Sequence, residues 1–165
     1  WWLIHEFYAR IPLSEPNYAG NIIVILANLP DFLRTPILKK RMMEFFSMSE
    51  SEKDEMINNA LDAGPTIPFP NFAKLFKTWL EVLCTISDEN RTELFSRYLI
   101  SIANSPNKIV CFNLDGIFEI FSGLDSSNIQ ILSNTIKKII ENLDQNSKKK
   151  ILLVCPDNAR KLIGF

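Results

Sequence analysis

The sequence predicts an all-α protein built from tandem helical units. Three observations indicate this fold class: apolar residues recur three and four positions apart, residues that start helices recur every nineteen residues, and the 165 residues contain only five glycines. So few glycines argue against a sheet with many tight turns. With 47% hydrophobic and 22% charged residues, the chain can bury a core, which excludes a disordered tail.

The nineteen-residue period begins at Leu29 with Pro30. Six of the seven first positions are Leu, Ile or Met, and all second positions are Pro, Ser or Asp. Ser and Asp can cap free backbone amides, and Pro has no amide to leave unpaired, so each step predicts a helix start. The later pairs are Met48 with Ser49, Ile67 with Pro68, Ile86 with Ser87, Ser105 with Pro106, Leu124 with Asp125, and Leu143 with Asp144.

Within each unit the apolar residues mark one helix face. The third unit shows this at Leu75, Trp79 and Leu83, which are four residues apart. Because the period leaves only a few residues for a turn, we expect one helix of about 13 to 15 residues per unit. Trp79 lies on the apolar face and is therefore expected in the core.

Units that open on proline alternate with units that open on serine or aspartate, so the larger repeat is 38 residues and two helices. We expect one all-helical domain over residues 1–165, in which 1–28 form a preceding helix pair, 29–142 form three αα repeats and 143–165 form capping helices. The three prolines within 63–72 predict an extended connection, the first place to look for a hinge. The period restarts at the end of the chain, which suggests part of a longer array.

Tandem two-helix units of this length resemble the α-solenoids, in which HEAT and armadillo repeats have a similar period. The resemblance covers about two thirds of the chain and is one of period and helix count only. It implies a right-handed α-α superhelix that acts as a scaffold or recognises a protein or peptide along a concave face. The alternative is a closed helical bundle that buries the same apolar stripes.

The residue types that carry chemistry are sparse. His5 is the only histidine, and Cys84, Cys111 and Cys155 are far apart in apolar stretches without a C-x-x-C pair. We therefore expect no metal, no cofactor and no catalytic site, and three buried free thiols in a reducing, cytoplasmic compartment. The longest apolar run, 22–27, is too short to cross a membrane. An enzyme whose site is assembled from scattered residues is the alternative, and it would need a cavity lined by polar groups.

Charge is balanced overall and uneven along the chain. A formal net charge of -1 argues against nucleic acid as a partner. Residues 48–66 are acidic, whereas 143–165 are basic and form a candidate interaction surface. At the unit starts, an acidic residue also recurs with a basic residue three positions later. These residues can form local ion pairs, or they can form a charged ridge along one edge of the stack. The basic residues of the C-terminal candidate surface are Lys148, Lys149, Lys150, Arg160 and Lys161, and the recurring pairs are Asp31 with Arg34, Glu50 with Lys53, and Asp88 with Arg91.

The N-terminus adds a second candidate surface, because Trp1, Trp2, Phe7 and Tyr8 form an aromatic cluster that one short helix cannot bury. The leading hypothesis is a non-enzymatic interaction or scaffold module of a larger assembly, which binds protein or peptide and no small-molecule substrate. The alternative partner is a membrane surface, contacted through these aromatic residues.

Overall fold

The computed structural model describes residues 18–165, and all regular elements in this range are helical. The predicted all-α class is thereby confirmed. The first helix of the expected pair within 1–28 falls mostly on residues 1–17, which lie outside the described part of the chain. The elements are α2 (Tyr18–Ala27), α3 (Asp31–Phe45), α4 (Glu50–Ala63), the 3₁₀ turn η1 (Gly64–Thr66), α5 (Phe69–Leu83), α6 (Asp88–Asn104), α7 (Pro106–Val110), α8 (Leu114–Ser122), α9 (Ser126–Asn142), α10 (Gln145–Val154) and α11 (Asp157–Leu162).

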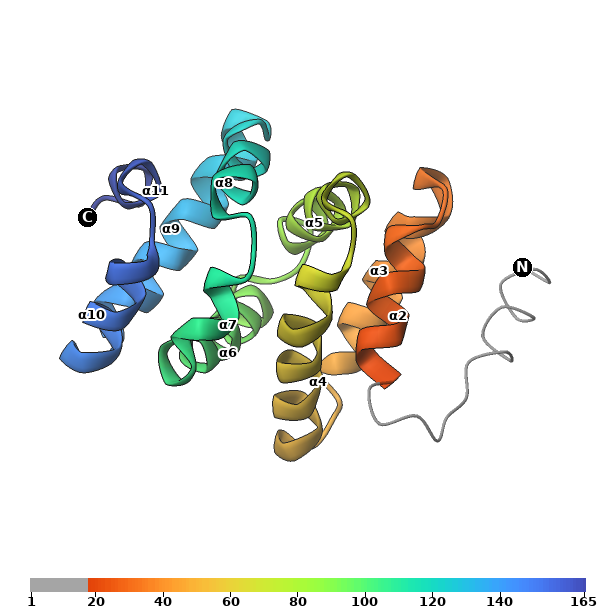
Figure 1. The fold of residues 1–165 in the computed structure, drawn as a ribbon, viewed down its shortest axis with the longest axis horizontal. Coiled ribbons are helices and arrows are strands. Elements are labelled where there is room, and N and C mark those ends of the chain that lie inside the picture. The colour runs from red at the N-terminus through yellow and green to blue at the C-terminus, as the bar shows by residue number, and fades with distance from the viewer. Residues whose placement is uncertain (1–17) are drawn as a thin grey trace.

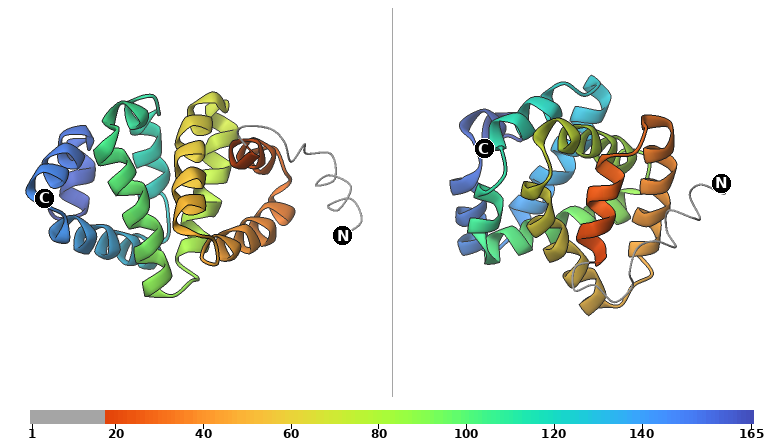
Figure 2. Two further views of the ribbon diagram at one scale, coloured as in Figure 1. Left: turned by 90° about the horizontal axis from the view of Figure 1, so that it is seen from below. Right: turned by 45° about the vertical axis from the view of Figure 1, so that its right-hand side comes forward.

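The helices follow one another along the long axis of the molecule, from α2 and α3 at one end to α10 and α11 at the other (Figure 1). Most helices pack mainly on the helix that comes two units later: α2 on α4, α3 on α5, α4 on α6, and α5 on α8, whereas α6 packs equally on α9 and α10. Two further views show the same row from below and obliquely, with the α2 and α3 end brought forward (Figure 2). Neighbouring units therefore supply most of the surface that buries each apolar stripe.

Six helices start where the sequence predicts, since α3, α4, α5, α6, α9 and α10 have N-cap residues at successive or doubled nineteen-residue steps. The side chains of Ser49, Ser87 and Asp144 accept hydrogen bonds from backbone amides of the first turn. Pro30 and Pro68 cap α3 and α5 without a side-chain bond. Asp125 at the start of α9 likewise makes no side-chain cap bond, so side-chain capping contributes to three of these six helix starts.

The fifth unit differs from the expected single helix because it is divided into α7 and α8. The first helix ends at Val110 with Cys111 as its C-cap, and Asn113 caps the second, since its Oδ1 accepts from the amide of Gly116 at 3.0 Å. The residue before it, Phe112, packs on Phe72 with ring centroids 5.5 Å apart. A Cβ on Gly64 would lie 2.5 Å from the Phe112 ring, so only glycine permits this approach. An aromatic contact with an earlier unit thus explains the division.

The expected extended connection at 63–72 is wrong. Pro65 lies in the first turn of η1, Pro68 is the N-cap of α5, and Pro70 lies in the first turn of α5. Proline is tolerated at each of these positions because backbone amides at the start of a helix have no hydrogen-bond partner within that helix. Ile67 and Phe72 are buried, so this segment is part of the core.

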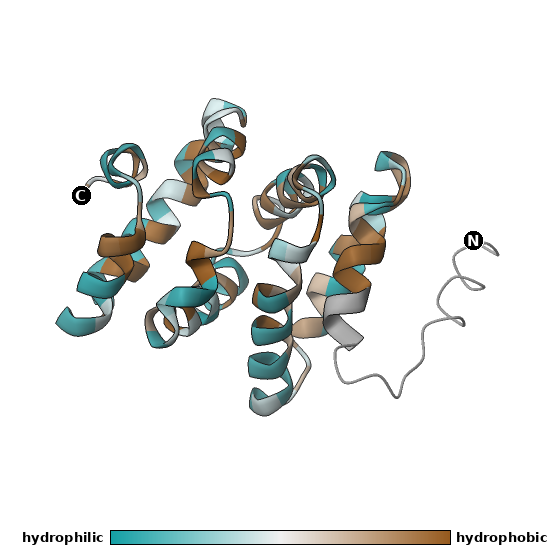
Figure 3. Ribbon diagram, in the orientation of Figure 1, coloured by the Kyte–Doolittle hydropathy of each residue, from teal (hydrophilic) through white to brown (hydrophobic). Residues whose placement is uncertain are grey.

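Buried apolar residues form three clusters along the row. The central one joins α3, α4, α5, α6 and α9, and it contains Leu83 and Leu132, both fully buried. A second cluster lies towards α2 and a third lies beneath α10 and α11. Colouring by hydropathy shows α2 mainly hydrophobic and α4 mainly hydrophilic on the side seen in Figure 3. Trp79 packs on Phe95 and Tyr98, with ring centroids at 5.6 and 5.3 Å, which confirms its predicted place in the core.

Candidate functional site

Arg91 is a buried cation that joins three helices. Only 4% of the residue is exposed. Its Nη1 donates to the carbonyls of Leu83 and Ile86 at 3.1 and 3.2 Å, and its Nε donates to Thr135 Oγ1 on α9 at 3.1 Å. Its Nη2 donates to the carboxylate of Asp88. The last carbonyls of a helix have no partner within that helix, so Arg91 satisfies the C-terminal end of α5 and fixes it to α9.

Arg34 repeats this arrangement in the first unit. It is 3% exposed, and it donates to the carbonyl of Leu26 at 3.0 Å and to the carbonyl of Leu29. These acceptors lie eight and five residues before the arginine, as they do for Arg91. The hydrogen bond from Arg34 lowers the pKa of the Asp31 carboxyl. In both units, an arginine three residues after an aspartate thus secures the C-terminal end of the preceding helix.

Lys53 occupies the equivalent position in the second unit and is 6% exposed. Its Nζ lies 2.7 Å from Glu93 Oε1 on α6, 3.9 Å from Glu50 Oε1, and 5.8 Å from the ring centroid of Phe45. The local ion pairs are therefore confirmed. The alternative of a charged ridge is wrong, because the three cations point into the protein and connect neighbouring helices.

An apolar cavity of about 310 Å³ lies between the helices of the N-terminal two thirds of the row. It is partly open, and its walls come from α2 through α9. Four aromatic residues that line it, Phe76, Trp79, Tyr98 and Phe112, are only partly buried by their neighbours. Burial raises the pKa of the Tyr98 phenol, so this residue is neutral throughout the physiological range. Among the residues that the structure describes, Arg41 is the only charged one in the wall.

The exposed face of α3 carries an apolar stripe that sequence reasoning missed. Phe32 is 77% exposed and Met43 is 45% exposed, and Pro36 and Lys39 are exposed between them. Steps of four, three and four residues place all four on one side of the helix. The sequence does not single out this stripe, because the buried residues of the same helix, such as Leu38, Met42 and Phe45, recur at an equal spacing.

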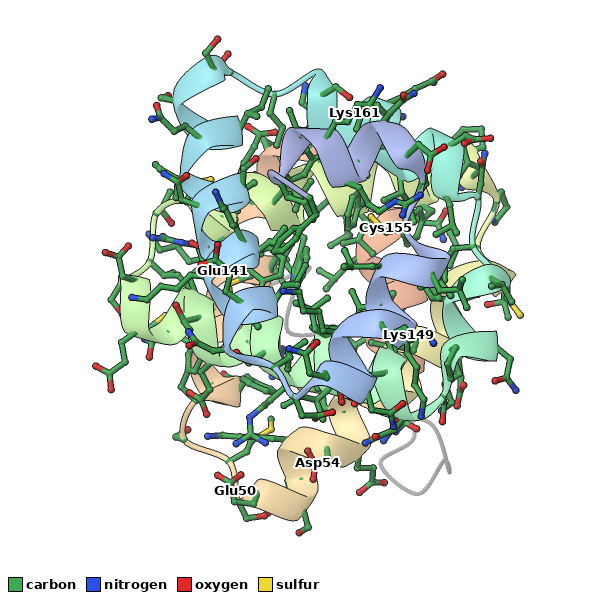
Figure 4. The ribbon with its side chains drawn as sticks, turned by 90° about the vertical axis from the view of Figure 1, so that its left-hand side faces the viewer. Glu50, Asp54, Glu141, Lys149, Cys155 and Lys161 are labelled. Carbon is green, nitrogen blue, oxygen red and sulfur yellow. The ribbon has the colours of Figure 1, made fainter. Side chains whose placement is uncertain are left out.

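The predicted basic surface at the C-terminal end is only partly brought together. Lys149, Lys150 and Lys161 are exposed. Figure 4 shows Lys149 on α10 and Lys161 on α11 apart from one another, with Cys155 between them. The remaining two are engaged within the protein: Lys148 Nζ lies 5.0 Å from the ring centroid of Phe165, and Arg160 pairs with Asp157. The other candidate residues, Trp1, Trp2, Phe7 and Tyr8, and also His5, lie outside the described residues.

The three thiols are free, as expected, but they differ in burial. Cys84 and Cys155 are partly buried, and desolvation raises the pKa of both thiols. Cys111 is exposed, so its predicted burial is wrong. It lies at the division between α7 and α8, where Phe112 turns inward and leaves its neighbour at the surface.

Thiol alkylation is expected to distinguish these residues. Because the thiolate is the reactive form, a raised pKa leaves less of it at neutral pH and slows the reaction. Iodoacetamide at pH 7.5 should therefore modify Cys111 first in the folded protein, with Cys84 and Cys155 following more slowly and accelerating towards higher pH. Peptide mass spectrometry over a time course measures this order. Equal rates for the three cysteines in folded protein would contradict it.

Within residues 18–165, no three His, Cys, Asp or Glu side chains are grouped so that they could hold a metal ion. No described helix combines the length and the apolar character that crossing a membrane requires. No protein-family model, curated protein or solved structure gives a significant match to this chain.

Proposed function

We propose that the chain is a non-enzymatic interaction module made of HEAT/armadillo-like helical repeats, and that it binds a protein partner within a larger assembly. The observation that carries this proposal is the exposed apolar stripe of α3. Soluble proteins place scattered apolar residues on their surfaces, but a row of them at helical spacing is typical of a face that packs on another helix. The helix lies at one end of the row (Figure 1), and Phe32 and Met43 on it are both exposed.

The matching partner surface is an amphipathic helix with an acidic flank. Phe32 and Met43 supply two apolar contacts about eleven residues apart, which is three helical turns. Lys39 lies between them and is exposed, so it would face an acidic residue of the partner. The basic residues at the opposite end, Lys149, Lys150 and Lys161, are a separate proposed contact for acidic protein surface.

Replacing both Phe32 and Met43 with serine tests the proposal. The double variant should melt at the temperature of the unchanged chain or slightly above it, because both side chains are exposed in the isolated protein. Partner capture from the native source, followed by quantitative mass spectrometry, should lose the proteins that bind through α3. Binding of a purified captured partner should then weaken by about tenfold or more.

Leu153 is the matched control, since it is 81% exposed on α10 at the other end of the row. Leu153→Ser should retain the partners that the α3 variant loses. Identical capture by all three proteins would contradict binding through α3, and a turnover activity of the isolated monomer would contradict a non-enzymatic module.

A further inference from the structure

We propose that the apolar cavity between the helices binds a hydrocarbon chain of about twelve carbon atoms whose carboxylate end lies at Arg41. This site is separate from the exposed face of α3 and goes beyond protein binding. The proposal rests on three properties of the cavity: its volume, its lining and the position of its one charged residue.

The volume is that of a ligand site. A cavity of about 150 Å³ lined by Leu, Ile and Phe is known to remain dry and to bind benzene. The cavity described here, at about 310 Å³, has twice that volume and lies at the lower end of the range for small-molecule sites. Room for two benzene-sized groups corresponds to about twelve carbon atoms.

The lining selects an apolar occupant. Phe76 and Trp79 on α5 lie on one side, and Ile102 on α6 and Ile109 on α7 are among the aliphatic residues of the wall. Ordered water needs two to four polar partners, which this wall does not offer over most of its surface. Aromatic residues that neighbouring side chains cover only in part would be fully covered by a hydrocarbon chain.

Arg41 supplies the polar end of the site. Its side chain is 24% exposed while it also lines the cavity, so it lies where the cavity meets solvent. Its Nη1 donates to Glu44 Oε2 at 2.7 Å, which holds the guanidinium in place. A guanidinium has five N–H donors and binds carboxylates in preference to neutral groups. A carboxylate at the end of the chain therefore fits this position better than an alcohol.

Tryptophan quenching tests occupancy. The chain has three tryptophans, so a Trp1→Phe and Trp2→Phe chain retains only Trp79, which lines the cavity. Dodecanoate brominated at its terminal carbon should quench Trp79 saturably below the concentration at which it forms micelles, and unbrominated dodecanoate should reverse the quenching. Dodecanol should bind about tenfold more weakly, and Arg41→Met should remove this difference.

Filling the cavity supplies the decisive control. Ala60→Leu places three more carbon atoms in the wall and should weaken dodecanoate binding by about tenfold or more, whereas Ala159→Leu on α11, remote from the cavity, should bind as the unchanged chain does. Ile109→Phe repeats the test from the α7 wall if Ala60→Leu does not fold. Absence of saturable quenching, or unchanged affinity in a folded filling variant, would overturn the proposal.

Discussion

Arg91→Met is expected to lower the free energy of unfolding by about 2 to 4 kcal/mol. The methionine keeps much of the apolar stem but removes the donors to Leu83, Ile86 and Thr135, all of them bonded to a residue that is 4% exposed. The carbonyl of Leu83 at the end of α5 and that of Ile86 in the following turn would lose this partner in a place that water reaches poorly. Urea unfolding followed by circular dichroism measures the loss.

Arg160 is the matched control, because it follows Asp157 at the same three-residue spacing as Arg91 follows Asp88. Its side chain is 40% exposed, and an exposed ion pair contributes little. Arg160→Met should therefore change the free energy of unfolding by less than about 0.5 kcal/mol. If the two variants were equally stable, the buried hydrogen bonds of Arg91 would not be what holds α5 to its neighbours.

Phe112→Ala is expected to cost about 3 kcal/mol, because the ring fills the space between Phe72 and Gly64. Gly64→Ala should cost about 1 to 3 kcal/mol for the opposite reason, since its new Cβ would lie 2.5 Å from that ring. The two effects should not add. Once the ring is absent, the methyl group has room, so Gly64→Ala should cost much less in the Phe112→Ala protein.

A double-mutant cycle in urea measures this coupling. Gly123→Ala is the control for substituting a glycine, because the backbone there is right-handed and an added Cβ would lie 3.3 Å from the Glu119 carbonyl oxygen, a tight contact but far longer than the 2.5 Å at Gly64. It should cost less than Gly64→Ala, at most about 1 kcal/mol, and this cost should be the same with or without Phe112. Additive costs for Gly64→Ala and Phe112→Ala would show that the two residues do not depend on each other.

The features that the sequence predicted are those decided locally. Ser49 and Asp144 begin helices because each side chain bonds an amide three residues away. The division of the fifth unit was missed because it depends on Phe112 reaching Gly64, which lies in another unit. The prolines of 63–72 led to the incorrect prediction of an extended connection, because proline suits both an extended segment and the first turn of a helix.

In the candidate sites, too, the sequence predicted the features that are decided locally and missed those that depend on distant contacts. The three-residue spacing of Asp88 and Arg91 was visible, and so was the ion pair, but burial of the arginine depends on where α5 ends and where α9 packs. The cavity could not be predicted at all, since its volume is what remains between helices once each has found its neighbours. The basic residues near the C-terminus were predicted from composition, which does not distinguish Lys149 in solvent from Lys148 beside an aromatic ring.

Most helices pack on the helix that lies two units later in the chain. This arrangement limits how far apart in sequence two contacting residues are. Among the described residues, the hydrogen bonds that join two side chains of different helices, from Lys53 with Glu93 to Lys108 with Asn58, connect positions 40 to 50 residues apart. Closing a chain segment of that length costs little more entropy than closing one half as long. Folding can therefore begin at any adjacent group of units and extend in both directions. Most residue contacts in the described chain are also local in sequence, which favours rapid folding, so a nascent chain could acquire structure before its last helix has been synthesised.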